Sequence, residues 1–145
     1  MDEQQQPPQN EPIPNLVLLK VLCVFTFVGS GLGAFSYGII GLMHGFFLEN
    51  LSLIPNEQNR ELIQMLLSAG QMFFFLNAIL YLVSLSGAVL LWKLRKTGFH
   101  LYTASQMVLL ILPLAYIKGF PTNFFSIFLT MVFALGYYGF LKFMK

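Results

Sequence analysis

The chain has 145 residues, of which 57% are hydrophobic and only 10% are charged, whereas an ordinary soluble domain carries about 25% charged residues. This composition excludes an ordinary soluble domain, and the formal net charge of +2 is too small to indicate a nucleic-acid-binding protein. The single cysteine, Cys23, excludes an intramolecular disulfide framework. The composition therefore predicts an integral membrane protein.

The first fifteen residues, 1–15, are rich in Gln and Pro, contain three acidic residues and show no apolar periodicity. Such a segment buries too little apolar surface to offset the entropy lost on ordering, so it is predicted to be a disordered tail. The uncharged run 21–48 that follows is longer than the roughly 7–15 apolar residues of a cleaved signal peptide. It is therefore predicted to be a retained transmembrane span, over about 17–47.

Small residues of the first span fall on one side of a helical wheel, within an arc of about 80°. A similar spacing of small residues recurs in the last span, and such faces let helix backbones approach closely in a membrane. Gly29 and Gly33 form a separate small pair, and a kinked or flexible helix is the competing interpretation. The predicted packing faces are Ser30, Ala34, Gly38, Gly41 and Gly45 in the first span, and Ser126, Thr130 and Ala134 in the last.

The segment 49–61 contains three glutamates and one arginine and is predicted to be the only substantial loop. Asn56 is expected to cap a helix, with Glu57 and Glu61 near the positive end of its dipole. The second span is predicted over about 62–92. Its length of about 46 Å exceeds a bilayer core of about 30 Å, so we expect it to tilt or to project outward.

A basic segment, 92–98, separates the second span from the third and holds three of the eight Lys and Arg residues. These cations must stay in water or among lipid headgroups, so the chain is expected to turn back here. Gly98 is expected to adopt the left-handed conformation that ends a helix. The residues predicted to lie at headgroup level are Trp92, Lys93, Arg95 and Lys96.

The third span is predicted over about 99–117 and the fourth over about 123–142, with Thr122 or Asn123 as the cap of the fourth. In this arrangement most cations fall on one side of the membrane, which by the positive-inside rule places both termini in the cytoplasm. That side holds Lys20, Lys93, Arg95, Lys96, Lys142 and Lys145, and the other holds Arg60 and Lys118.

The sequence predicts no catalytic, cofactor or metal site, and we therefore expect a protein that is not an enzyme. No Asp or Glu lies inside a predicted span, which argues against an intramembrane hydrolase and against proton-coupled transport. His44 and His100 are expected at opposite ends of the membrane and cannot share an ion. A site formed by His44 with Glu57 and Glu61 is the remaining, less favoured metal hypothesis.

Polar residues inside the spans are predicted to form two hydrogen-bonded layers, because stepping along each helix at about 1.5 Å per residue places them at two depths. Their simplest role is hydrogen bonding between helices, and lining a small pocket for a lipid or solute is the alternative. The inner layer is expected to join Gln106 with Ser30, Ser84 and Ser86, and the outer layer to join Asn77 with Tyr37, Tyr116 and Ser126.

The segment 92–106, WKLRKTGFHLYTASQ, resembles the basic hairpin of small uncharacterised four-span bacterial membrane proteins. In those proteins a basic turn is followed by Gly-aromatic-x-Leu-Tyr, as at 98–102 here, and by a Gln one turn further on, as at Gln106. The resemblance implies a bacterial cytoplasmic (inner) membrane protein and implies no activity.

The predicted fold is all-α, with four antiparallel transmembrane helices in a domain over 16–145 behind the tail 1–15. The first functional hypothesis is a non-enzymatic membrane protein that acts through helix–helix contacts, as a homo-oligomer or a small accessory subunit in the lipid bilayer. The alternative is a small carrier or channel for a neutral or lipidic solute. A polar cavity along the first three spans would favour the alternative, and a solid small-residue interface would favour the first.

Overall fold

The computed structural model describes residues 16–119 and 124–145, and these residues form helices and turns without strands. The predicted tail 1–15 and the predicted caps Thr122 and Asn123 lie outside the described residues. Three of the described helices are long and apolar enough to cross a membrane, and a fourth apolar helix is shorter. The coarse prediction of an all-α chain with several apolar helices is therefore confirmed.

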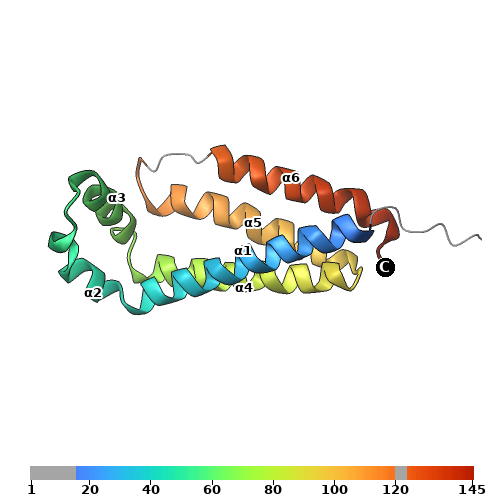
Figure 1. Cartoon of the computed structure of the whole chain (residues 1–145), viewed down its shortest axis with the longest axis horizontal. Helices are drawn as coiled ribbons and strands as arrows, with labels where there is room; N and C mark the ends of the chain where they lie inside the picture. Colours follow the sequence, from blue (N-terminus) through green and yellow to red (C-terminus); the bar gives the residue numbers. More distant parts are fainter. Residues whose placement is uncertain (1–15, 120–123) are drawn as a thin grey trace, which may run out of the picture.

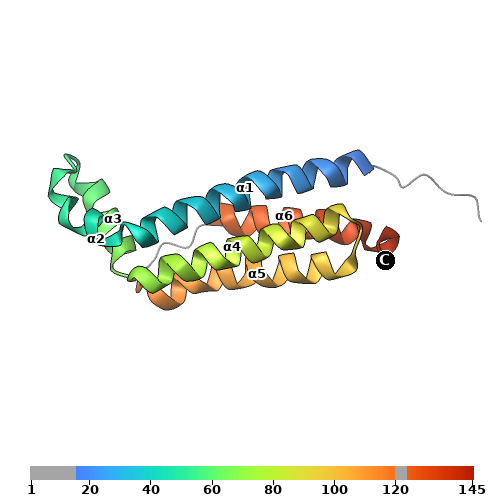
Figure 2. The ribbon, with the colours of Figure 1, turned by 90° about the horizontal axis from the view of Figure 1, so that it is seen from below.

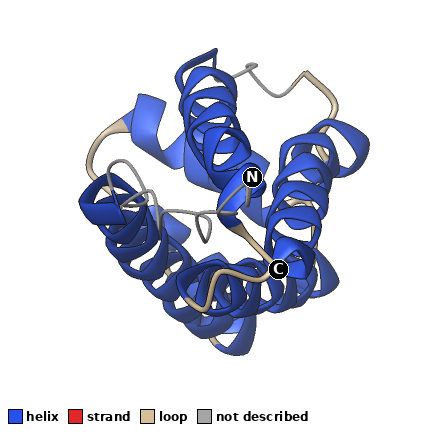
Figure 3. Ribbon diagram, turned by 90° about the vertical axis from the view of Figure 1, so that its right-hand side faces the viewer, coloured by secondary structure: helices blue, strands red, loops and turns tan. Residues whose placement is uncertain are grey.

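The long helices run side by side in alternating directions, and the short ones form a cap at one end (Figures 1 and 2). Figure 3 looks along the helices onto the opposite end, which holds the C-terminus. The long apolar helices are α1 (Leu16–Leu42), α4 (Gln71–Trp92) and α5 (Lys96–Tyr116), with the shorter α6 (Phe124–Phe140) beside α1 and α5. The cap contains α2 (His44–Glu49), η1 (Leu51–Leu53) and α3 (Glu57–Leu67), and η2 (Leu141–Phe143) follows α6.

The first predicted span, 17–47, contains two helices, because α1 ends at Leu42 and a turn at Met43 leads into α2. The last carbonyl groups of a helix have no partner within it and need another donor. The side chain of Gln71 supplies one, with Nε2 donating to the Gly41 carbonyl over 2.9 Å. The end of α1 is thereby tied to the start of α4.

The second predicted span, 62–92, is two helices rather than one long one. The chain breaks between α3 and α4 at Gly70, whose φ of +83° is one that residues with a side chain rarely adopt. His44 donates from Nε2 to the Leu67 carbonyl at the end of α3 over 2.9 Å. The 22 residues of α4 span about 33 Å, close to a bilayer core of about 30 Å, so the excess length forms the cap instead of a tilted helix.

The predicted start of α3 is confirmed. Asn56 precedes the helix, and its side-chain oxygen accepts a hydrogen bond from the Gln58 N–H over 3.0 Å. Glu57 lies in the first turn, where its negative charge is favourable. Arg60 donates to the Ile54 carbonyl over 2.7 Å, which fixes the loop that enters the helix.

The turn between α4 and α5 differs from the prediction, because Leu94 rather than Gly98 has the left-handed conformation, with φ of 56°. The Arg95 N–H donates to the Leu90 carbonyl and the Leu94 N–H to the Leu91 carbonyl, which is the hydrogen-bond pattern of a Schellman motif. The side chain of Leu94 packs against the hydrophobic core, which compensates for the cost of this conformation in a residue other than glycine.

Two hydrophobic clusters lie toward opposite ends of the long helices. One lies near the α4–α5 turn and comprises the buried residues Leu19, Cys23, Leu91, Tyr102, Tyr137, Phe140 and Met144. The other lies near the cap and comprises Leu67, Phe73, Phe74 and Ile117. The polar residues Ser30, Ser84 and Gln106 lie between the two clusters along α1, α4 and α5.

Candidate functional site

Glycines bring α4 and α5 into direct backbone contact. A Cβ atom added at Gly98 would lie 2.6 Å from the Leu91 nitrogen and 2.7 Å from the Gly87 oxygen. A Cβ atom added at Gly87 would lie 2.8 Å from the Tyr102 nitrogen. Gly98 therefore serves the close approach of two helices rather than the turn for which the sequence suggested it.

The contact between α1 and α4 also uses glycines. The ring of Tyr81 covers Gly33, where an added Cβ would lie 2.7 Å from Cε1, and at Gly41 an added Cβ would lie 3.3 Å from the Cβ of Phe74. Tyr37 stacks on Tyr81, with ring centroids 5.5 Å apart. α1, α4 and α5 thus form one closely packed unit.

Only some residues of the predicted packing face of the first span pack against other helices of the same chain. Ser30 and Gly41 are buried and Ala34 is half-buried. A Cβ atom added at Gly38 would meet no atom of another described helix within 4 Å, and the same holds at Gly45, which belongs to α2 rather than α1. Gly38 therefore makes no close helix contact among the described residues, and its packing against a second copy stays a prediction.

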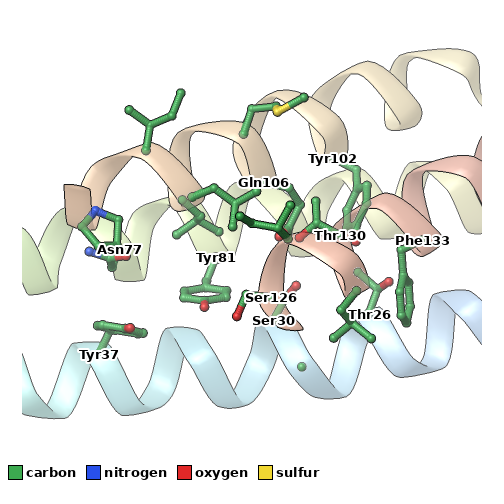
Figure 4. A pocket seen from close by; sticks show the side chains of 18 of the residues that line it. Thr26, Ser30, Tyr37, Asn77, Tyr81, Tyr102, Gln106, Ser126, Thr130 and Phe133 are labelled. Atoms are coloured by element: carbon green, nitrogen blue, oxygen red, sulfur yellow. The ribbon is translucent and has the colours of Figure 1, made fainter. Parts of the chain in front are cut away.

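A cavity of about 610 Å³ lies between α1, α4, α5 and α6 (Figure 4). Ser126 and Thr130, predicted as part of a packing face on the last span, line this cavity, while Ala134 is half-buried outside it. The polar residues of the lining are Thr26, Ser30, Tyr37, Asn77, Tyr81, Tyr102, Gln106, Ser126 and Thr130.

A chain of hydrogen bonds on one side of the cavity joins the three closely packed helices. Gln106 Nε2 donates to Ser84 Oγ over 2.9 Å, and Ser84 Oγ is bonded to Ser30 Oγ over 3.1 Å. The structure thus brings together three residues that the sequence placed at one depth. Ser86, expected in the same layer, is exposed and donates back to the Leu82 carbonyl of its own helix.

The hydrogen bond that Asn77 makes differs from the one expected for the outer layer. Asn77 is 2% exposed, but its Nδ2 donates to the Phe73 carbonyl one turn earlier in α4, over 2.8 Å. No hydrogen bond joins Asn77 to Tyr37, Tyr116 or Ser126 among the described residues. Asn77 therefore belongs to the cavity wall and to its own helix rather than to a second layer between helices.

The sequence did not reveal the polar contact between α1 and α6. Thr26 Oγ1 and the Tyr137 hydroxyl share a hydrogen bond of 2.7 Å, and both residues are buried. The Tyr137 ring also meets the edge of Tyr102, with centroids 5.2 Å apart. Thr26 lies one turn from Ser30 on the inner face of α1, which is the available signal, but neither Thr26 nor Tyr137 belongs to the polar layers that the sequence predicts.

The basic turn lies at the end of the molecule, as expected from its charge. Lys93, Arg95 and Lys96 are exposed. Trp92 is 45% exposed and packs on Phe27 of α1, with ring centroids 5.9 Å apart. An amphipathic ring in this position suits the boundary between lipid and water.

Within residues 16–119 and 124–145, no three His, Cys, Asp or Glu side chains lie close enough together to hold a metal ion. His44 is instead engaged with the Leu67 carbonyl. His100 is exposed and contacts the neighbouring Phe99 ring.

Comparison of the chain with protein-family models, with curated proteins and with solved structures finds no match. The resemblance of the segment 92–106 to small four-span bacterial membrane proteins therefore stays a prediction, and the function must be argued from the cavity and its surroundings.

Proposed function

We propose that the protein is a four-span membrane protein that binds a neutral lipidic molecule in the cavity between α1, α4, α5 and α6. The observation that carries this proposal is the cavity of about 610 Å³ with polar groups at its wall, within helices that are apolar enough to cross a membrane. Its volume falls in the range of about 300–1,000 Å³ that is typical of small-molecule sites.

The lining indicates the charge of the ligand. No described residue that lines the cavity is an Asp, Glu, Lys, Arg or His. A charged ligand would be uncompensated there, at a considerable cost in a medium of low dielectric constant. Hydroxyl groups, together with the amide of Gln106, can instead hydrogen bond to a hydroxyl or carbonyl group. These features favour a neutral molecule with a small polar group.

The apolar residues of the lining indicate how such a molecule enters. Several of them are exposed on the outer surface of α1, α5 and α6, so the cavity is open toward the side of the molecule. In a membrane this side faces acyl chains, which favours entry from the bilayer rather than from water. The exposed apolar lining residues are Phe25, Met107, Ile111, Leu114 and Leu129.

Mild-detergent purification of the full chain, followed by mass spectrometry of the co-purifying lipids, tests this proposal. Thr130→Phe places a ring into the cavity, whereas Met131→Phe adds a ring at an exposed position on the same helix. We expect a defined neutral lipid in the wild-type protein and in Met131→Phe, and at least a severalfold lower amount in Thr130→Phe. Equal amounts of the same lipids in all three proteins would contradict the proposal.

A second candidate function is association through helix contacts, as a homo-oligomer or an accessory subunit. It is favoured by Gly38, because a Cβ atom added there would meet no described atom of another helix within 4 Å, so a helix of another molecule has room to approach. Gly38→Leu should then lower the oligomer order, whereas Phe35→Leu at an exposed position should not. A monomer by light scattering in mild detergent for the wild-type protein would exclude the homo-oligomer.

The proposed location is a bacterial cytoplasmic membrane with both termini in the cytoplasm. It is supported by the bias of cations toward the end with the α4–α5 turn. Single cysteines at Asn56 and Thr97 in a Cys23→Ser background, probed in intact cells with an impermeant maleimide, test the orientation. We expect labelling at position 56 alone, and labelling at 97 alone would reverse the topology.

A further inference from the structure

The α4–α5 turn and the end of the chain are joined by backbone hydrogen bonds. The Lys96 N–H donates to the main-chain oxygen of Lys145 over 3.0 Å, and the Lys145 N–H donates to the Leu94 carbonyl over 2.9 Å. The side chains of Leu94 and Met144 pack in the same hydrophobic cluster. Lys145 is therefore held beside the turn, although it is far from it in the sequence.

This pairing gathers like charges around one cleft. The cleft has a volume of about 620 Å³ and is lined by Lys93, Arg95 and Lys145, together with Leu94 and Thr97. The described carboxylate side chains are all in the cap or its loops, at the opposite end of the molecule (Figure 1). Three side-chain cations share the cleft, and among the described residues at most the main-chain carboxylate of Lys145 lies there to offset them. A net positive charge therefore remains, and a bound anion would offset the repulsion among the cations.

We infer that this cleft binds the phosphate group of an anionic phospholipid. The planar guanidinium of Arg95 suits bidentate hydrogen bonding to phosphate oxygens, and the two lysines supply compact positive charges. The Thr97 hydroxyl adds a neutral donor at the start of α5. Basic pockets at the ends of transmembrane helices are a known means of recognising anionic headgroups.

The surroundings favour a lipid over a soluble phosphate. Trp92 lies next to the cleft in sequence and is half-exposed. Val89 and Leu101 lie one helical turn from Lys93 and Thr97 on the membrane side, and both are exposed. A phosphate in the cleft would thus place its acyl chains along apolar helix surface. This site is separate from the intramembrane cavity and does not depend on its function.

Trp92 is the only tryptophan of the chain, so its fluorescence reports on this site. The full chain is reconstituted into phosphatidylcholine vesicles that contain a small fraction of either brominated phosphatidylglycerol or brominated phosphatidylcholine. We expect stronger quenching by the anionic lipid, with an apparent preference on the order of tenfold or more, because each nearby cation contributes roughly fivefold.

A matched pair of triple variants separates the cleft from the overall charge. Lys93→Gln/Arg95→Gln/Lys145→Gln removes the cleft cations, and Lys20→Gln/Lys118→Gln/Lys142→Gln removes the same charge elsewhere. The preference for the anionic lipid should disappear in the variant that lacks the cleft cations and persist in the variant that lacks the other three lysines. Absence of a preference in the wild-type protein, or equal loss in both variants, would overturn the inference.

Inorganic phosphate distinguishes the two sources of a phosphate group. Added at constant ionic strength, it should leave the quenching by brominated phosphatidylglycerol unchanged if the cleft holds a lipid. Displacement of the lipid at millimolar phosphate would assign the cleft to a soluble phosphate and overturn the lipid assignment. Because this arm and the preference measurement both use the wild-type chain, the inference remains testable even if a triple variant fails to fold.

Discussion

The contact between α4 and α5 and the contacts of α6 show two ways in which apolar helices meet in this molecule. At Gly87 and Gly98 the backbones of α4 and α5 touch, and no side chain separates them. On α6, an added Cβ at Gly136 would meet only the flexible end of Leu22, at 2.9 Å, and a large ring at Tyr137 reaches across to Thr26. The size of the residues at each contact decides whether helices close on one another or leave a cavity between them.

Of the substitutions that test this comparison, Gly98→Ala should lower the stability of the protein most. The added methyl group would lie 2.6 Å from the Leu91 nitrogen, and backbone atoms cannot give way as a side chain can. We expect the free energy of unfolding to fall by about 1–3 kcal/mol, as for other overpacked positions. Thermal unfolding in a mild detergent measures the change.

Gly31→Ala is the matched control, because a Cβ atom there has no described neighbour within 4 Å. It should leave stability unchanged or raise it by up to about 1 kcal/mol through helix propensity. Equal melting temperatures for the two variants would show that α4 and α5 are not in backbone contact.

Tyr137→Phe should have the next largest effect, since it removes the buried hydrogen bond between α6 and α1. We expect a loss of about 1 kcal/mol, because Thr26 is left without its partner but can turn back to its own helix. Tyr138→Phe, at an exposed position next along the chain, should cost much less. If the two variants unfold at the same temperature, the Thr26 contact does not hold α6 in place.

Ser84→Ala should have a smaller effect, although Ser84 is fully buried and bonded to two other helices. Hydrogen bonds between membrane helices contribute about 0.6 kcal/mol on average, and this substitution removes two of them. Two such bonds would total about 1.2 kcal/mol, but the Ser30 hydroxyl can bond back to its own helix, so we expect a loss of about 1 kcal/mol or less in the same assay. Ser86→Ala, which removes only a bond within α4, should be close to neutral, and a greater loss for Ser86→Ala would contradict the account.

Gly136→Ala should have the smallest effect and sharpens the comparison with Gly98→Ala, because the chemical change is identical. The Leu22 side chain can move aside, so we expect a change below about 0.5 kcal/mol in either direction. A loss as large as that of Gly98→Ala would mean that α6 packs on α1 as closely as α5 packs on α4, which would contradict the comparison.

The sequence predicts those features of the structure that one strong physical signal determines. Hydropathy and charge locate the end of α4 at Trp92, and the Asn56 cap follows from local chemistry alone. Depth along a helix follows from its rise per residue, so the sequence predicts that Gln106, Ser84 and Ser30 lie at one depth, where hydrogen bonds join them.

Features that depend on how helices are rotated or interrupted could not be predicted in this way. Gly70 stands in an uncharged run in which hydropathy does not distinguish one long helix from two. The break there depends on its φ of +83° and on the side-chain partners of the neighbouring helix ends. Leu94 takes the left-handed conformation predicted for Gly98, because its side chain is anchored in the hydrophobic core. The cavity depends on the relative rotation of several helices, which a periodic pattern in one span does not determine.

Site-specific photo-crosslinking tests most directly whether the cavity holds a ligand. A benzophenone side chain replaces Ser126, which lines the cavity, or Phe128, which is 64% exposed on the outer face of α6. After irradiation in native membranes, the adduct at position 126 should be one defined neutral lipid, and the adducts at position 128 a mixture of bulk phospholipids. The same bulk mixture at both positions would show that the cavity is only a lipid-filled gap between helices.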